Sequence, residues 1–191
     1  MKEDCELLLS YTRRGDVPSL SALVRRHAVW MQAFLRGLLP TVADAEDAFQ
    51  ETWIRVIKAA GSYRGGSVKA YLATVARSAA IDRLRRQGRT ISLDADEGGG
   101  ASALEDMPSA APTPGERFES AATAEEVQNA VRTLPDGPRQ VLLMRIEGEM
   151  SFKEIATELD VPIGTALTWM RTATMKLRRL LGGEECMKTG N

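Results

Sequence analysis

The side chains best suited to chemistry in this 191-residue chain are clustered cations. Between residues 61 and 90 seven arginines and lysines face a single acid, Asp82. Positive charge concentrated on one short segment binds phosphate, and tyrosines at positions 63 and 71 within it offer ring faces for unstacked bases. This combination is typical of a surface that binds single-stranded nucleic acid.

The residues that usually carry enzymatic chemistry are nearly absent. His27 is the only histidine, and its helical spacing with apolar neighbours predicts a structural place on a packed face. Neither a GxSxG turn nor a Walker-type loop occurs. Cys5 and Cys186 lie near opposite ends, which argues against a zinc site or a disulfide and favours two reduced thiols. We therefore predict no enzymatic activity, cofactor, metal site or small-molecule substrate.

Acidic residues occupy two other parts of the chain. The segment DAEDAFQETWIRVIKAA, residues 44–60, begins with acids and suits a protein partner. Residues 91–126 hold nine acids against one cation, Arg117, although the whole chain has a net charge of only −1. A charge block of this kind is usually a solvated linker, and beside a basic helix it also competes with nucleic acid for that surface.

The chain shows no signal for a membrane. No apolar run approaches the length of a span, and the first residues, MKEDCELLLSYTRRGD, carry acids where a signal peptide needs a basic flank. We therefore expect a cytoplasmic protein without direct membrane insertion.

Apolar residues at steps of three and four predict helix after helix, and hence an all-α protein. A first stripe runs from Leu20 to Leu38 and ends before Pro40. The next helix, capped by Thr41 or Asp44, is predicted to pack through Val42, Ala45, Phe49, Trp53, Val56 and Ala60. A third begins at Ser67 or Val68 after a Gly/Ser loop. It packs through Val68, Tyr71 or Leu72, Val75, Ala79 and Leu84, leaving Lys69, Arg77, Arg83, Arg85 and Arg86 toward solvent.

We predict two small helical domains, each with a modest core, joined by a flexible acidic linker. The first covers residues 1–89. Residues 90–120 hold a Gly triplet and three prolines and need no fold; if flexible, they have a root-mean-square span of about 30 Å. The second domain covers 121–182, with a break at Pro135–Pro138, and 183–191 form a disordered tail.

The second domain carries a helix-turn-helix pattern. Ser151 and Glu154 form a capping box at the start of SFKEIATELD, and Asp160-Val161-Pro162 make the turn. Residues Ala166, Met170, Ala173 and Leu177 then recur at helical spacing. This geometry would place Thr165 to Arg171 in a DNA major groove.

The strings DAEDAFQETWIRV and AYLATVARSAAIDRLRR, within residues 20–89, resemble region 2 of bacterial sigma-70 factors of the small extracytoplasmic-function group. The resemblance implies that the first string binds the clamp helices of the largest subunit of core RNA polymerase, through Asp44, Asp47, Gln50, Glu51 and Trp53. It also implies that the loop and basic helix grip and melt the minus-10 promoter element on the non-template strand, through Tyr63, Arg64, Lys69, Tyr71, Arg77, Arg83, Arg85 and Arg86. Tyr71 suits core packing and base contact equally.

LPDGPRQVLLMRIEGEMSFKEIATELDVPIGTA resembles region 4 of the same family, which reads the minus-35 element in duplex DNA. It implies DNA contacts from Lys153, Thr165, Thr168, Trp169, Arg171, Thr172, Lys176, Arg178 and Arg179. The second helix departs from the family, because Leu167, Thr168, Trp169, Thr172 and Thr174 stand where several basic residues are usual. Trp169 could contact a thymine methyl or a protein, although partial burial is slightly favoured.

The resemblance implies a sigma factor that directs promoter-specific transcription initiation and melts the minus-10 element. The alternative is a stand-alone helix-turn-helix regulator, which would explain residues 151–181 but leave the first domain without a role. Factors of this group commonly have an inhibitory anti-sigma partner, although no residue here identifies one.

Overall fold

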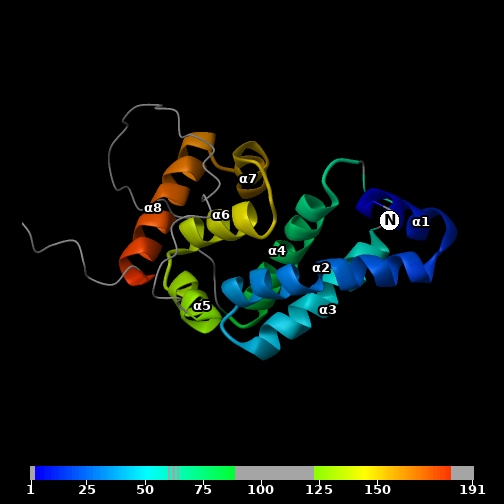
Figure 1. Ribbon diagram of the computed structural model, residues 1–191, viewed down its shortest axis with the longest axis horizontal. Coiled ribbons are helices and arrows are strands. Elements are labelled where there is room, and N and C mark those ends of the chain that lie inside the picture. The colour runs from blue at the N-terminus through cyan, green and yellow to red at the C-terminus, as the bar shows by residue number, and fades with distance from the viewer. Residues whose placement is uncertain (1–2, 60, 62, 64, 89–122, 182–191) are drawn as a thin grey trace, which may run out of the picture.

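The computed structural model describes residues 3–59, 61, 63, 65–88 and 123–181, and in those ranges it has helices and no strand (Figure 1). The all-α prediction is therefore confirmed. The helices are α1 (Asp4–Arg14), α2 (Val17–Leu38), α3 (Val42–Lys58), α4 (Val68–Arg86), α5 (Ala124–Arg132), α6 (Asp136–Ile146), α7 (Phe152–Leu159) and α8 (Ile163–Leu181). The predicted linker and tail lie outside the described residues.

Helices α1 to α4 form an N-terminal lobe around the long helix α2. Thr41 and Ser67 cap α3 and α4 by accepting hydrogen bonds from the backbone N–H three residues on. Of the alternatives predicted from the sequence, Thr41 rather than Asp44 is thus the cap of α3, and α4 begins at Val68. The structure differs from the sequence-based expectations at Val42 and at α1. Val42 is exposed because it lies on the outward side of the first turn of α3, in which Asp44 and Ala45 are buried. Helix α1, which the sequence analysis did not predict, packs Leu7 and Leu8 into the core.

Helices α5 to α8 form a C-terminal lobe that contains the helix-turn-helix. The predicted capping box is present, since the Ser151 hydroxyl accepts from the Glu154 N–H and the Glu154 carboxylate accepts from the Ser151 N–H. Helix α7 ends at Asp160, which adopts the left-handed conformation, and α8 starts at Ile163. Pro162 thus stands one residue before the helix.

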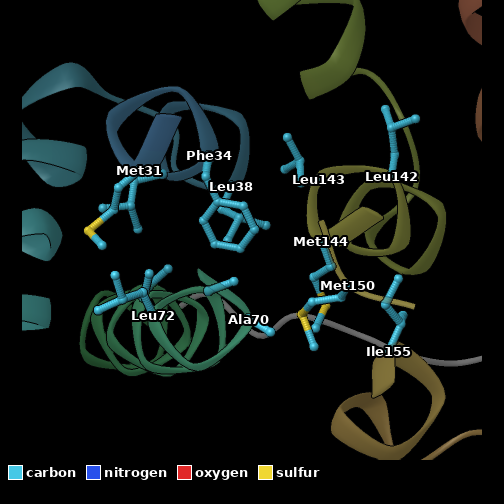
Figure 2. Close-up of a cluster of buried hydrophobic side chains, with 14 of the residues drawn as sticks. Met31, Phe34, Leu38, Ala70, Leu72, Leu142, Leu143, Met144, Met150 and Ile155 are labelled. Atoms are coloured by element: carbon cyan, nitrogen blue, oxygen red, sulfur yellow. The ribbon is translucent and has the colours of Figure 1, made fainter. Parts of the chain in front are cut away.

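The two lobes share one continuous hydrophobic core, where the sequence predicted a separate core for each. Phe34 and Leu38 of α2 face Leu143 and Met144 of α6 (Figure 2). Gly37 makes this close approach possible, because a Cβ there would lie 2.8 Å from both terminal methyl groups of Leu143. Such contacts join residues about a hundred positions apart and leave no local periodicity, so one sequence could not reveal them.

Polar contacts also cross between the lobes. The Gln128 amide donates to the carbonyl of Ala33 at 3.2 Å, and the Arg132 guanidinium donates to the carbonyl of Arg36 at 3.0 Å. Both acceptors lie on α2 near its end, beside the shared core. In the described part of the chain, no helix has the length and apolar character to cross a bilayer.

Candidate nucleic-acid interface

The acidic segment and the basic segment are neighbouring helices, α3 and α4, that pack against each other along much of their length (Figure 1). Asp44 fastens the start of α3 to the end of α4. Its carboxylate accepts from the Thr41 hydroxyl at 2.6 Å and from Arg83 Nε and Gln87 Nε2, each at 2.7 Å. The Thr41 hydrogen bond and then the Arg83 hydrogen bond hold the pKa of Asp44 below its ordinary value. The sequence placed Asp44 on an open acidic face; the structure corrects this, because its side chain is buried and fully engaged.

The open face of α3 consists of Asp47, Gln50, Ile54 and Ile57, with Glu51 at its edge. Glu51 is held by Arg55 at 2.8 Å, and that hydrogen bond lowers the pKa of its carboxyl. Ile54 and Ile57 were not among the residues predicted from the sequence. Both are apolar residues that lie outside the inward stripe of α3, and this is the signal in the sequence that could have found them. In the structure each is more than 40% exposed. This face therefore combines acids with an apolar centre.

Trp53 lies on the inner side of α3, where its indole packs edge-on against Phe49 at a centroid distance of 6.2 Å. It is buried, as its place in the predicted stripe requires. Its Nε1 has no hydrogen-bond acceptor among the described residues. A direct contact between Trp53 and a partner would need the surrounding side chains to move.

Two tyrosines gather at the start of α4. The rings of Tyr63 and Tyr71 lie 5.5 Å apart, and the Tyr63 hydroxyl donates to the carbonyl of Gly66 at 2.6 Å. Burial raises the pKa of Tyr63. Both rings pack on the edge of the core while remaining partly exposed, which fits either use predicted for Tyr71. Arg64, predicted beside them, lies outside the described residues.

The cations of α4 divide into two groups. Arg85 and Arg86 are exposed at its end, while Arg83 bridges Asp44 and Asp47 at 2.7 Å each. Arg83 thus serves the α3–α4 contact first, and that pairing raises its pKa.

Lys69 and Arg77 point toward the C-terminal lobe, where the sequence predicted solvent. Lys69 pairs with Glu149 at 2.7 Å and lies 5.3 Å from the Trp30 ring centroid. Arg77 donates to Gln140 at 2.7 Å and pairs with Glu158 of α7 at 3.2 Å. Burial lowers the pKa of Arg77, opposed by Glu158. Both cations are therefore occupied at the contact between the lobes.

Helix α8 presents one of its sides to solvent and packs the other on α6 and α7. Trp169 is on the packed side: its ring lies so close to Gly137 that a Cβ there would be 2.8 Å from it. Burial, the slightly favoured alternative for Trp169, is what the structure shows. Among the other predicted minus-35 contacts, five are exposed (Lys153, Thr168, Arg171, Arg178 and Arg179), while Thr165, Thr172 and Lys176 are partly buried.

Within the described ranges, the side chains that could bind a metal or transfer a proton are chiefly histidine, cysteine and the acids. Among the described residues, no group of three or more histidines, cysteines or acids is arranged to hold a metal ion. His27, the only histidine of the chain, is buried as predicted, with Nε2 3.0 Å from Asp4 and Nδ1 accepting from Trp30 Nε1 at 2.8 Å. Both ring nitrogens are thus engaged in structural hydrogen bonds.

The chain is similar to known sigma-70 proteins both in its two regions and over most of its length. The family model for sigma-70 region 2 matches residues 23–90, and that for sigma-70 region 4 matches residues 124–177. RNA polymerase sigma factor CarQ of Myxococcus xanthus is 32% identical over 172 residues, which cover 89% of this chain and 93% of that protein. ECF RNA polymerase sigma factor SigE of Mycolicibacterium smegmatis is 31% identical over 169 residues, 88% of this chain and 63% of its length.

A solved structure shares the fold. The sigma factor RpoE from Bartonella quintana, in complex with the anti-sigma factor NepR, matches with a TM-score of 0.64 at 19% identity. The match covers 87% of this chain and 98% of that one.

Proposed function

Because this chain belongs to the extracytoplasmic-function group of sigma-70 RNA polymerase sigma factors, we propose which of its surfaces carry out the promoter-directed initiation that defines the family. The chain confers promoter specificity on core polymerase and has no catalytic role of its own. It acts in the cytoplasm, where polymerase and chromosome meet.

We assign core-polymerase binding to the open face of α3. Asp47, Gln50 and Glu51 supply the polar contacts, and Ile54 with Ile57 supplies an apolar centre. Interfaces of this kind gain most of their affinity from buried apolar anchors, with charged residues at the rim steering association. Asp44 supports this face from inside by holding α3 against α4.

We assign the melted non-template strand to the two ends of α4. Tyr63 and Tyr71 offer ring faces at its start, and Arg85 and Arg86 offer exposed guanidinium groups at its end. Ring stacking with flanking cations is the general means of holding single-stranded nucleic acid. Arg83, Lys69 and Arg77 can join only by leaving their present partners.

Promoter engagement requires the lobes to separate. Minus-10 and minus-35 elements lie roughly 25 base pairs apart, or about 85 Å of B-form DNA at ~3.4 Å per base pair. In the structure Arg77, assigned to the first element, pairs at 3.2 Å with Glu158 in the helix-turn-helix assigned to the second. One closed molecule cannot place both on their elements, so the ion pair and the shared core must open.

An anti-sigma factor is a further expected partner. The similar RpoE was solved bound to the anti-sigma factor NepR. We propose that an inhibitor of this class binds the present chain in the closed arrangement, in which Lys69 and Arg77 are withheld from DNA.

The observation that carries the proposal is the pairing of a sigma-70 region 2 match at residues 23–90 with a helix-turn-helix in one chain. A stand-alone regulator would use only the C-terminal lobe and would leave the open face of α3 and the tyrosine pair without a role. The similarity of the chain to sigma factors does not favour that alternative.

Run-off transcription tests the function. Core polymerase supplemented with this chain should produce discrete transcripts from a genomic fragment library, and core polymerase alone should not. The free chain should bind the same duplexes weakly. Tight operator binding by the free chain, with no transcript upon addition of core polymerase, would instead identify a stand-alone regulator.

A further inference from the structure

The outer face of α8 is unusually poor in hydrogen-bond donors for a helix that reads DNA. Opposite the buried side formed by Ala166, Trp169 and Ala173, its first turns expose Gly164, Leu167 and Thr168. Gly164 presents no side chain, and open space lies over it. Leu167 is 39% exposed. The first cation on this face is Arg171.

Thr168 adds no free donor. Its hydroxyl donates to the carbonyl of Gly164 at 2.9 Å, so the proton is used within the helix. What remains for a ligand is a hydroxyl oxygen that can accept and a methyl group. The polar Trp169 Nε1 is also removed from this face, because the ring packs against Gly137 in the interior.

A helix-turn-helix contacts base edges through the N-terminal residues of its second helix. In the major groove, guanine offers only acceptors, adenine offers one acceptor and one donor, and thymine offers an acceptor with a projecting C5 methyl. Neither Leu167 nor Thr168 has a free side-chain donor for an acceptor on a base. They can, however, cover a methyl group, which is the one apolar feature among the four bases.

We propose that α8 reads the upstream promoter element chiefly through thymine methyl groups, which Leu167 and the Thr168 methyl contact. Arg171 supplies the cationic donor at this part of the groove. Lys153 at the start of α7, with Arg178 and Arg179 at the far end of α8, contacts the flanking phosphates. All three are exposed. This inference rests on the proposed sigma function and specifies how its upstream element is recognised.

Deoxyuridine substitution tests the inference directly, because deoxyuridine differs from thymidine only by the missing methyl. Core polymerase carrying the full chain selects fragments from a duplex library with a randomised upstream element. Each thymine of the selected elements is then replaced by deoxyuridine. At one or two positions we expect the holoenzyme concentration for half-saturation to rise about fourfold, as loss of one buried methyl group implies.

Two variants assign the effect to the helix face. With Leu167→Ala, deoxyuridine and thymidine templates should bind within about 1.5-fold of each other at the position that Leu167 contacts. With Leu167→Lys, which adds a donor suited to guanine, selection should shift from thymine toward guanine there. Arg13→Ala, an exposed change on α1, is the matched control and should retain the deoxyuridine effect.

The possible outcomes distinguish a failure of methyl recognition by α8 from a failure of the proposed sigma function. Selected elements that lack thymine, or that tolerate deoxyuridine everywhere, would overturn methyl recognition while transcripts from those fragments left the sigma function intact. A deoxyuridine effect that persists in Leu167→Ala at every position would also overturn it. Failure of the holoenzyme to select or transcribe any fragment would contradict the proposed function and this inference together.

Discussion

At the scale of single residues, burial distinguishes a carboxylate that holds the fold from one that lies at the surface. Asp44 and Asp47 both lie near the start of α3 and both contact Arg83. Only Asp44 is buried, and only Asp44 also accepts from Thr41 and Gln87. The sequence could identify the acidic segment but not this difference, because it depends on where α4 ends.

Replacing Asp44 should therefore destabilise the fold, whereas replacing Asp47 should not. Asp44→Ala removes charge-assisted hydrogen bonds at a buried site, and we expect a loss of about 2 kcal/mol in the free energy of unfolding. Asp47→Ala, a surface change, should cost below about 0.5 kcal/mol. Urea denaturation followed by circular dichroism measures both. Equal losses for the two variants would contradict the structural role of Asp44.

The buried histidine gives the fold a pH dependence of definite sign. Burial lowers the pKa of His27, opposed by Asp4, with Arg26 and Lys69 lowering it further. The unfolded state then binds more protons as the pH falls below the unfolded pKa of about 6.5. Stability contributed by neutral His27 is thus present above pH ~6.5 and is lost as the pH falls through the lower, folded-state pKa.

We expect the melting temperature of the wild-type chain to fall between pH 7.5 and 5.5 more than that of His27→Gln, which has no titrating group there. Protonation would place a proton on Nδ1, where His27 now accepts from Trp30. Differential scanning fluorimetry across this range compares the two proteins. Parallel curves would show that His27 does not titrate in the way its burial indicates.

At the scale of elements, the local signals in the sequence located most of the helices, but α1 was not predicted although Glu3 and Glu6 form a capping box at its start. The Ser151–Glu154 box and the turn at Asp160 lie where predicted, and Thr41 is one of the two caps predicted for α3. Helix α4 begins at Val68, one of its two predicted starts. Arg77 was placed wrongly, because the cationic face of α4 turns out to meet the C-terminal lobe. Helical periodicity gives the direction of a side chain but not the element that it meets.

The contact between α6 and α8 depends on a small residue at Gly137. An added Cβ would lie 2.8 to 2.9 Å from three atoms of the buried Trp169 ring, so one of the helices must shift. Gly137→Ala should destabilise the C-terminal lobe by about 1–3 kcal/mol, the usual cost of overpacking.

Gly164→Ala is the matched control, since open space surrounds that position and alanine favours a helix. Thermal unfolding measures the stability of both variants, and only Gly137→Ala should be less stable than the wild type. A Gly137→Ala protein as stable as the wild type would mean that Trp169 does not press against α6 as described.

At the scale of the whole molecule, the closed arrangement and the function require different shapes. Arg77–Glu158, Lys69–Glu149 and the contact of Gly37 with Leu143 hold the lobes together. The two promoter elements require them apart. The sequence predicted two domains and the surfaces each would use, but not their association, since that rests on contacts between distant segments.

A large side chain at position 37 should separate the two lobes. Gly37→Leu places a large side chain where the Leu143 methyl groups already lie, so the radius of gyration should rise above the value of about 16 Å expected for a compact chain of this length. Gly61→Leu, at an exposed position with open space around it, should leave the radius unchanged. Small-angle scattering compares them, and an equally compact Gly37→Leu protein would argue that the core between the lobes repacks around the added side chain.

The affinity of the chain for core polymerase tests the central claim most directly. The double variant Asp47→Lys/Ile54→Asp reverses a rim charge and places a charge in the apolar centre of the open face of α3. Competition against labelled wild-type chain should show at least a tenfold loss, about 1.4 kcal/mol, with a matching loss of transcripts. Val29→Asp, on an exposed part of α2, should compete as well as the wild type. Undiminished competition by the double variant would contradict the claim that this face of the N-terminal lobe binds the polymerase.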